Sequence, residues 1–298
     1  MRDNQPLNSK QAYKTYAKQF KAYADHFGQI SVPAVPNTVA NFLRHLHEDN
    51  DLSANTICRV ARSAVADLHR FRPETPTDHI LVEETCKVLT VKAKKIKPKK
   101  IPIRSNILLK LLSTLDLSTL QDLTTATMLV LSYKGFLRSD ECTKLKADDL
   151  WIEEVISNGI ATTALFVFVE KSKTDQTRIG HTIVLGMDNL NPWKCPVRHF
   201  RAFSKKRSDA EFFFHNASTL KKLPAKGVNS ALKKACKVAG LDSKLYSSHG
   251  LRAGGATEAA AKGIRTRQIK KHGNWKSSAV YLYIHDDVET QLQVSLAI

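Results

Sequence analysis

The sequence lacks the long apolar runs that cross a membrane. No stretch of about 18 uncharged apolar residues occurs in the chain, and the first ten residues, MRDNQPLNSK, have no apolar core of the kind found in a signal peptide. Cysteine is scarce too: there are 5, an odd number, and the nearest two, Cys58 and Cys86, stand 28 positions apart. This spacing argues against a disulfide framework and against a CxxC zinc site. We therefore expect a reduced, intracellular protein that holds no metal and binds no membrane.

Signatures of several common enzyme classes are missing as well. The chain has no GxxxxGK[ST] phosphate loop, no GxGxxG after a strand, no HExxH motif and no GxSxG motif. Acidic residues are few: 28 Asp and Glu stand against 46 Lys and Arg, which leaves a net charge of +18 in 298 residues. An excess of this size indicates a polyanionic partner such as nucleic acid or an acidic protein.

The positive charge is spread along the chain. Residues 1–105 hold 18 Lys and Arg against 10 Asp and Glu, and the remaining residues hold 28 against 18. Two modules that share one polyanion would have this distribution, and so would two solvated basic surfaces with no common ligand.

A lysine-rich stretch marks the expected domain boundary. Lys92–Pro102 (KAKKIKPKKIP) has six lysines in nine residues and two prolines, which oppose continuation of a helix. We place a helical domain at 1–97, a basic linker at 98–104 and a second domain at 105–298. The lysines can lie along a phosphate backbone, or the stretch can be a solvated tether or a nuclear-import patch. They are Lys92, Lys94, Lys95, Lys97, Lys99 and Lys100.

The pattern of apolar residues predicts a mainly α-helical protein. Four segments before the boundary, at about 8–27, 37–46, 53–68 and 81–91, have the 3.6-residue period of a small helical bundle. Two strands, 165–169 and 181–185, flank a polar stretch and predict an antiparallel hairpin. Around them we expect a short helix with Arg138 and Glu141, and helices at about 119–133, 196–206, 226–239, 248–262, 266–271 and 277–284.

Two HxxR motifs place a proton acceptor and a cation on one helical face, at His249–Arg252 and at His69–Arg72. The second is expected to end a surface helix. The first is followed by Gly254–Ala256, small residues that let a helix pack closely or let a ligand backbone approach. Farther on come Tyr281 and Tyr283, about 200° apart around a helix, so only one of them can face a site that Arg252 reaches.

Five short motifs follow one another along the predicted second domain. They are GFLRSDE at 135–141, SKTD at 172–175, HGLR at 249–252, GNW at 273–275 and LYIH at 282–285. Together they resemble the catalytic boxes of the tyrosine recombinase/integrase family, in particular its Cre-like and Crypton-like members. NPWKCPVR at 191–198 and PAVPNTVANFLRHL at 33–46 are also similar to that family, the latter to the core-binding domain of Cre-like enzymes. The resemblance covers nearly the whole chain, and it implies a helical core-binding domain followed by a tyrosine-recombinase catalytic domain.

The resemblance also implies a reaction. The family cleaves DNA by attack of a tyrosine oxygen on the scissile phosphate and uses neither a metal nor ATP, so no cofactor is expected. Guanidinium groups suit the charge of the phosphate oxygens. The implied roles are phosphate binding by Arg138 and Arg252, proton transfer by His249, protonation of the leaving oxygen by Lys173, an indole donor from Trp275, and nucleophilic attack by Tyr283, with Glu141 as an acidic support.

Some assignments stay open at this point. Lys171 competes with Lys173 and Tyr281 with Tyr283, while His272 and His285 are expected to be surface or supporting groups. The implied partners are double-stranded DNA sites and further copies of the chain, as a dimer on one site and a tetramer in the synapse.

The tail at 286–298 is expected to dock on a neighbouring protomer or to fold back on its own core. The leading interpretation is a mobile-element recombinase, located in a nucleus if eukaryotic and in the cytoplasm or nucleoid if prokaryotic. A catalytically silent DNA-binding descendant, a type IB topoisomerase and a generic basic nucleic-acid-binding protein are the alternatives.

Overall fold

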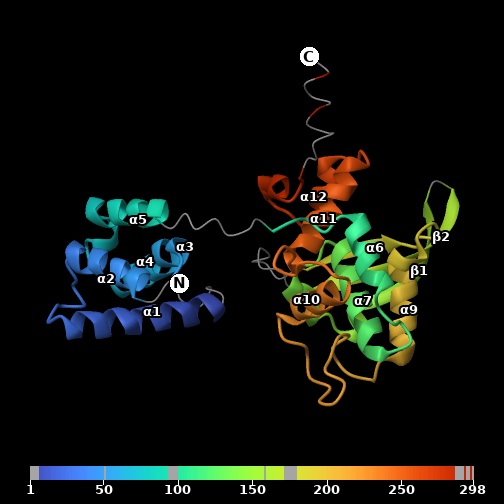
Figure 1. Cartoon of the computed structure of the whole chain (residues 1–298), viewed down its shortest axis with the longest axis horizontal. Coiled ribbons are helices and arrows are strands. Elements are labelled where there is room, and N and C mark those ends of the chain that lie inside the picture. Colours follow the sequence, from blue (N-terminus) through green and yellow to red (C-terminus); the bar gives the residue numbers. More distant parts are fainter. Residues whose placement is uncertain are drawn as a thin grey trace. The chain divides into compact units, whose positions relative to one another are not determined.

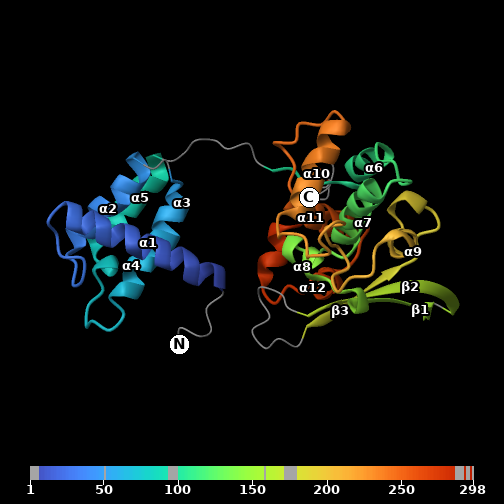
Figure 2. The same cartoon turned by 90° about the horizontal axis from the view of Figure 1, so that it is seen from below.

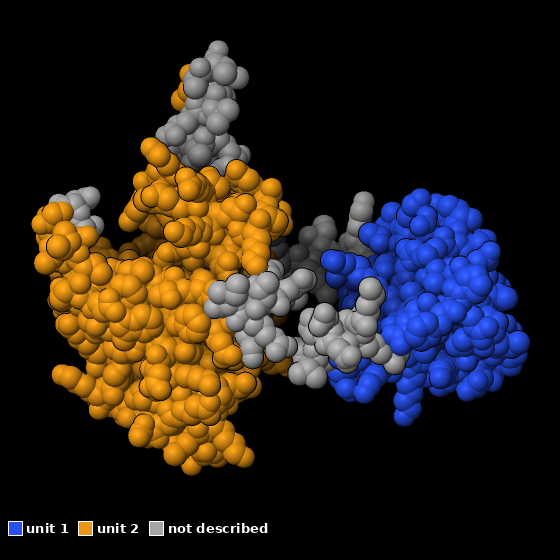
Figure 3. Space-filling model, turned by 180° about the vertical axis from the view of Figure 1, so that it is seen from behind, with its two compact units in different colours: residues 1–97 blue, residues 98–298 orange. Residues whose placement is uncertain are grey.

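The computed structural model describes residues 7–49, 52–92, 100–157, 159–170 and 180–285, together with Leu292 and Leu296. The chain divides into two compact units, residues 1–97 and 98–298, shown in blue and orange in Figure 3. Residues 93–99, at the predicted boundary, lie outside the described part. No helix among the described residues is long and apolar enough to cross a membrane.

Unit 1 is a helical bundle. Its helices are α1 (Leu7–His26), α2 (Pro36–Glu48), α3 (Ala54–Thr56), a π-helical turn (Ile57–Ala61), α4 (Arg62–Leu68), a 3-10 turn (Pro76–Asp78) and α5 (Ile80–Lys92) (Figure 1). The predicted third helix is therefore segmented, and Ser53 caps it by accepting from the Thr56 N–H. The core of the bundle contains Phe20, Phe42, Leu43, Ile57, Val65 and Val82, each at most 1% exposed.

The second HxxR motif ends a helix, but its histidine is not at the surface. His69 follows α4 and is 1% exposed. Its Nε2 atom accepts a hydrogen bond of 2.9 Å from the Ala34 N–H, and its Nδ1 atom lies 2.9 Å from the Val65 carbonyl oxygen. This histidine connects α4 to the turn before α2, a contact between residues 35 positions apart that the sequence pattern does not reveal.

Unit 2 contains most of the predicted helices. They are α6 (Ser105–Ser113), α7 (Leu120–Lys134), α8 (Ser139–Lys144), α9 (Pro196–Lys206), α10 (Gly227–Val238), α11 (Ser248–Ala261) and α12 (Thr266–His272). Helix α6 was not predicted from the sequence. The helix predicted at 277–284 is a 3-10 helix, η6 (Ser278–Leu282), whose first turn is capped by the Ser277 hydroxyl.

A three-stranded antiparallel sheet completes unit 2 (Figure 2). The two predicted strands correspond to β2 (Ile160–Val169) and β3 (His181–Gly186), and a strand that the prediction missed, β1 (Leu150–Ser157), pairs with the other edge of β2. β1 contains two consecutive glutamates, which interrupt the alternation typical of strands. The fold is mainly helical with a small antiparallel sheet, as predicted. Residues 171–179, between β2 and β3, lie outside the described part.

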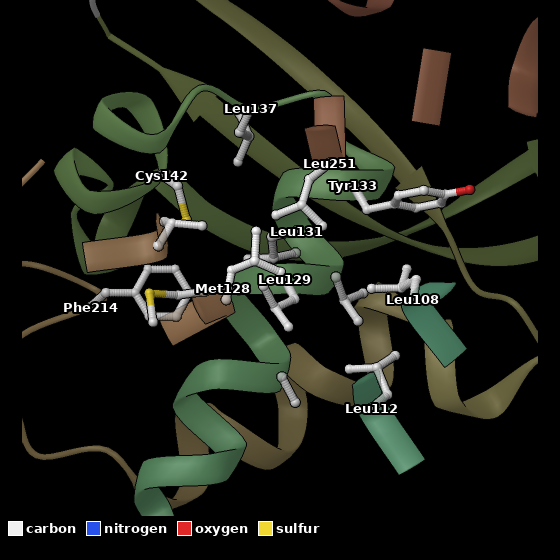
Figure 4. Packing of buried hydrophobic residues seen from close by; sticks show 14 of the residues in the cluster. Leu108, Leu112, Met128, Leu129, Leu131, Tyr133, Leu137, Cys142, Phe214 and Leu251 are labelled. Atoms are coloured by element: carbon white, nitrogen blue, oxygen red, sulfur yellow. The ribbon is translucent and has the colours of Figure 1, made fainter. Parts of the chain in front are cut away.

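Helix α7 lies at the centre of the unit 2 core. Every residue from Ala126 to Tyr133 is buried, which is typical of a helix surrounded by other elements on all sides. Figure 4 shows Met128, Leu129 and Leu131 of this helix packed among side chains from α6, α8 and α11. The end of α7 therefore has a fixed position, and the loop that follows it carries Arg138.

The segment from 100 to 104 packs within unit 2, although the sequence analysis assigned it to a linker. Ile101 N–H donates to the Leu245 carbonyl at 2.9 Å, and Ile103 N–H donates to the Gly250 carbonyl at 2.9 Å. Ile103 is fully buried. A Cβ atom on Gly254 would overlap the Ile103 carbonyl, so this glycine allows α11 and the segment to pack backbone against backbone.

Candidate active site

The structure brings together six of the seven side chains predicted for catalysis or its support. Arg138 stands at the N-terminus of α8 and Glu141 in its first turn. His249 and Arg252 lie on α11, Trp275 follows α12, and Tyr283 follows η6. Lys173 and its competitor Lys171 lie outside the described residues, so the structure does not distinguish them.

Glu141 joins the two arginines. Its Oε1 atom lies 2.5 Å from Arg138 Nη1, and its Oε2 atom lies 3.8 Å from Arg252 Nη1. The same carboxylate accepts the Arg138 backbone N–H at 2.8 Å and so closes the first turn of α8. Glu141 is 3% exposed. One buried carboxylate between two guanidinium groups leaves one positive charge in excess, which suits an anionic ligand.

Arg252 is held by carbonyl groups of two loops. It is 2% exposed, its Nη1 atom donates to the Phe136 carbonyl, and its Nη2 atom donates to the Gly273 carbonyl at 2.6 Å. Burial and the nearby charge of Arg138 lower its pKa to about 10, so it stays cationic at neutral pH. Its Nε atom is buried and has no acceptor among the described residues.

Both loops contain a residue in the left-handed backbone region. Phe136 and Asn274 each have a φ of 50°, a conformation that costs energy for residues other than glycine. Phe136 presents its carbonyl to Arg252, and Asn274 directly precedes Trp275 while its amide lies 3.1 Å from His181 Nδ1 at the start of β3. Neither residue was predicted from the sequence to support the site. Asn274 carried a signal, since asparagine tolerates this region better than most residues, whereas Phe136 carried none.

Tyr283, and not Tyr281, faces the site. The Tyr283 ring lies 4.8 Å from the His249 ring and 4.9 Å from the Trp275 ring, and the Arg252 guanidinium lies 5.4 Å from it. Tyr281 is 64% exposed. The two residues diverge because η6 turns by about 120° per residue. This geometry favours Tyr283 as the nucleophile.

The backbone around Tyr283 is fixed by hydrogen bonds that the sequence analysis did not foresee. Thr257 Oγ1 donates to the Tyr283 carbonyl at 2.9 Å and accepts the His285 N–H at 3.1 Å. Arg104 Nη2 donates to the His285 carbonyl at 3.1 Å. Since these hydrogen bonds join residues far apart in the sequence, no local pattern indicated them.

His249 and Trp275 are the two aromatic side chains in contact with the Tyr283 ring. Partial burial, and then the positive charges of Arg252 and Arg138, lower the pKa of His249, so its ring is neutral at pH 7 and can accept a proton. The Trp275 ring lies 4.1 Å from the Arg252 guanidinium. Trp275 is 6% exposed, and its Nε1 atom is buried with no acceptor among the described residues.

His272 and His285, the two histidines expected to be surface or supporting groups, hold the loops around the site. His272 lies 2.8 Å from the Lys134 carbonyl through Nε2 and stacks edge-on with Phe136 at 4.7 Å. Burial lowers its pKa, so it serves as a neutral donor beneath the loop that holds Arg252. His285 contributes its backbone groups to the hydrogen bonds with Thr257 and Arg104.

The structure describes only two of the six lysines at the boundary. Lys92 is exposed at the end of α5, and Lys100 is exposed with its ammonium donating to the Lys244 carbonyl. Lys94, Lys95, Lys97 and Lys99 lie outside the described residues.

Comparison with known proteins relates this site to one family. The model of the phage integrase family matches residues 103–290, which include α6 to α12, the sheet and all seven of the residues predicted for catalysis or its support. Among curated proteins, an integrase/recombinase xerD homolog from Selenomonas ruminantium is 25% identical over 293 residues, or 93% of this chain and 81% of that protein.

Solved structures share the fold. The Tn1549 transposon integrase in complex with circular intermediate DNA has a TM-score of 0.66 at 14% identity, over 100% of this chain and 96% of that one. The XerH recombinase in a post-cleavage complex with its palindromic difH substrate has a TM-score of 0.62 at 16% identity, over 94% of this chain and 76% of that one. A lambda integrase dimer on a COC′ core site has a TM-score of 0.54 at 18% identity, over 85% and 65%.

Proposed function

Because the chain belongs to the phage integrase family of tyrosine-type site-specific recombinases, we propose that it cleaves and rejoins double-stranded DNA through a 3′-phosphotyrosine intermediate. The observation that carries this proposal is the pair of buried N–H groups, Arg252 Nε and Trp275 Nε1, that find no acceptor among the described residues beside Tyr283. A buried donor without an acceptor costs about 1–3 kcal/mol. A bound phosphate would supply acceptors and remove this cost.

The scissile phosphate would be held by the cationic groups of the site. Arg138 and Arg252 would bind its non-bridging oxygens, because charge-assisted hydrogen bonds from guanidinium groups stabilise the charge that builds up in the transition state. Glu141 would keep both guanidinium groups in place through the contacts described above. Trp275 would donate its indole N–H to the same phosphate.

The chemical step exchanges one phosphoester bond for another. The Tyr283 oxygen attacks phosphorus, the bond from phosphorus to the 5′-oxygen breaks, and a 3′-phosphotyrosine forms. The tyrosine proton passes to neutral His249, whose ring lies 4.8 Å from the Tyr283 ring. Lys173 would protonate the departing 5′-oxygen. Because the bond energy is kept in the phosphotyrosine, attack by a second 5′-hydroxyl reverses the step without ATP or a metal.

The proposed partners are DNA target sites and further copies of the chain. The solved relatives are described as complexes with circular intermediate or difH DNA, and one as a dimer on a core site, which supports DNA as a partner and a dimer on one site. A tetramer in the synapse is the further part of this proposal. A cavity of about 330 Å³ behind the site, lined by Phe136, Ile264 and Ile269, is a candidate acceptor for the apolar tail of a neighbouring protomer. The similarity to a transposon integrase supports an origin in a mobile element.

Covalent trapping tests the proposed function. The protein is incubated in EDTA with labelled duplexes from the DNA that flanks its coding sequence, each nicked just 3′ of a candidate cleavage position. We expect a covalent protein–DNA band on a denaturing gel, and we expect Tyr283→Phe to abolish it while DNA affinity stays nearly the same, since only the nucleophilic oxygen is lost.

Tyr281→Phe is the matched control, because Tyr281 is exposed two residues away, and this variant should form the band normally. Salt-sensitive binding of these duplexes with no covalent band would contradict catalysis and identify a DNA-binding descendant of the family.

A further inference from the structure

Unit 2 has a groove that its proposed catalysis does not use. It has a volume of about 670 Å³ and lies between the start of α7, the loop before it, the turn at 190–194 and α9. Helices α7 and α9 run side by side here (Figures 1 and 2). We propose that this groove binds an acidic amphipathic segment of a partner protein.

The apolar part of the groove is built around an exposed tryptophan. Trp193 is 50% exposed, and Leu117 and Leu123 line the groove with it. The Trp193 carbonyl accepts a hydrogen bond of 2.8 Å from His199 Nε2, and the next residue, Lys194, is buried with its ammonium donating to Ser105 Oγ. The turn is thus fixed, so burying the indole on a partner requires little ordering of the backbone.

The charged part of the groove is basic. Arg198, Arg201 and Lys205 project from α9, are exposed, and form no ion pair with any described residue. Lys206 follows them and donates to the Ser118 carbonyl at 2.7 Å. No described carboxylate lines the groove. Carboxylates of a partner would pair with these guanidinium and ammonium groups.

The apolar part and the basic part of the groove together indicate which kind of partner it binds. A DNA backbone offers phosphates but little apolar surface for Trp193 and Leu117, whereas an amphipathic segment offers both an apolar and an acidic face. Tryptophan and arginine are the residues most enriched at the energetic centres of protein interfaces. The groove contains both types within one surface.

The groove is separate from the candidate active site. Leu123, in the first turn of α7, lines the groove, while Phe136, just beyond the end of α7, holds Arg252. Thirteen residues at about 1.5 Å each place the two about 20 Å apart along the helix. A partner in the groove therefore leaves the site around Tyr283 open.

The test uses the full chain and three fluorescein-labelled 16-residue peptides. The first is a helical peptide with Leu and Trp on one face and Glu on the other, the second has the same composition in scrambled order, and the third has Lys in place of Glu. Fluorescence anisotropy should show the first peptide binding about tenfold or more tightly than either of the others. Hydrogen exchange should show protection of 190–206.

Two variants test the groove separately: one reverses its charge and the other removes the exposed Trp193 indole. Arg198→Glu with Arg201→Glu should weaken binding of the first peptide about tenfold, and Trp193→Ala, which changes no charge, should weaken it by a similar factor. The matched control is Lys234→Glu with Lys237→Glu on the exposed side of α10, which makes the same change in net charge and should bind normally. Circular dichroism checks that each variant is folded.

Three outcomes would overturn the proposal. Equal binding of the scrambled peptide would show attraction by charge alone. Displacement of the first peptide by an equimolar 20-base-pair duplex would show that the groove binds phosphate. Tighter binding in the groove by a synthetic peptide of residues 286–298 would assign the groove to a second copy of this chain.

Discussion

At the scale of single residues, the site depends on a few buried polar groups with fixed partners. Arg252 is held by the Phe136 and Gly273 carbonyls and by Glu141. The residue types that meet here were predictable from the sequence through the resemblance of five motifs to the catalytic boxes of the tyrosine recombinase family. Their supports were not: Thr257 and Arg104 act through backbone carbonyls far away in the sequence.

The pKa of His249 gives a prediction at this scale. Partial burial, Arg252 and Arg138 all lower it from the usual value of about 6.5. A lowered histidine pKa means that the neutral form, which can accept a proton, persists to more acidic pH. In an NMR titration we expect His249 to titrate below pH 6.5, and Arg138→Gln to move the midpoint upward because one repelling charge is removed.

Arg44→Gln, on the exposed side of α2 in unit 1, is the control and should leave the His249 midpoint unchanged. A midpoint above 6.5 in the unsubstituted protein would contradict the described surroundings of His249.

At the scale of elements, helices with a clear apolar period were predictable and shorter elements were not. The ends of α9 match the prediction at Pro196 and Lys206. Helix α6 was missed, and β1 was missed because two glutamates interrupt its pattern. The segment at 100–104 was assigned to a linker because lysines and prolines surround it, whereas its packing depends on Gly250 and Gly254, about 150 residues later.

The packing of α11 gives a prediction at this scale. Gly254→Ala should destabilise unit 2 by about 3 kcal/mol, because the added Cβ would overlap the Ile103 carbonyl. The reason is steric, since the glycine lies between two backbones. Urea denaturation followed by circular dichroism measures the change.

Gly186→Ala is the matched control, since nothing lies within 4 Å of the position of its Cβ. It should change the free energy of unfolding by well under 1 kcal/mol. Equal stability of the two variants would show that α11 does not pack against 101–103 in solution.

The lysine-rich boundary gives a second prediction for an element. If the lysines at 92–100 lie along DNA, replacing all six with Gln should flatten the dependence of the binding constant on salt. The log–log slope should fall in magnitude by about 0.9 for each phosphate that a lysine no longer neutralises. Fluorescence anisotropy between 50 and 200 mM salt measures this slope.

Lys205→Gln, in the groove on α9, serves as a single-charge control and should leave the slope unchanged. An unchanged slope in the sixfold variant would show that the boundary lysines point away from phosphate.

At the scale of the whole molecule, the chain consists of two units that each have a core of their own. The order of five short motifs over about 150 residues indicated the family, although no single motif was specific. That order was readable because catalysis limits which residue types can stand at each position. Catalysis does not limit the residue types on surfaces away from the site, so the groove beside Trp193 was not predicted from the sequence.

The division into units gives a prediction for the whole chain. A fragment of residues 98–298 should fold alone and unfold in one cooperative transition, because its core contains α6 to α11 and the sheet. Its DNA affinity should be lower than that of the full chain and its salt dependence weaker, since unit 1 is removed. Calorimetry that shows no cooperative transition for the fragment would contradict the division.

The most direct measurement identifies the residue that is covalently bonded to DNA in the trapped complex. The covalent complex is digested with nuclease and trypsin, and the peptide that retains a nucleotide is sequenced by mass spectrometry. We predict that the nucleotide is attached to Tyr283, the tyrosine that contacts His249 and Trp275. Attachment to Tyr281, or to any other residue, would contradict this account of the site.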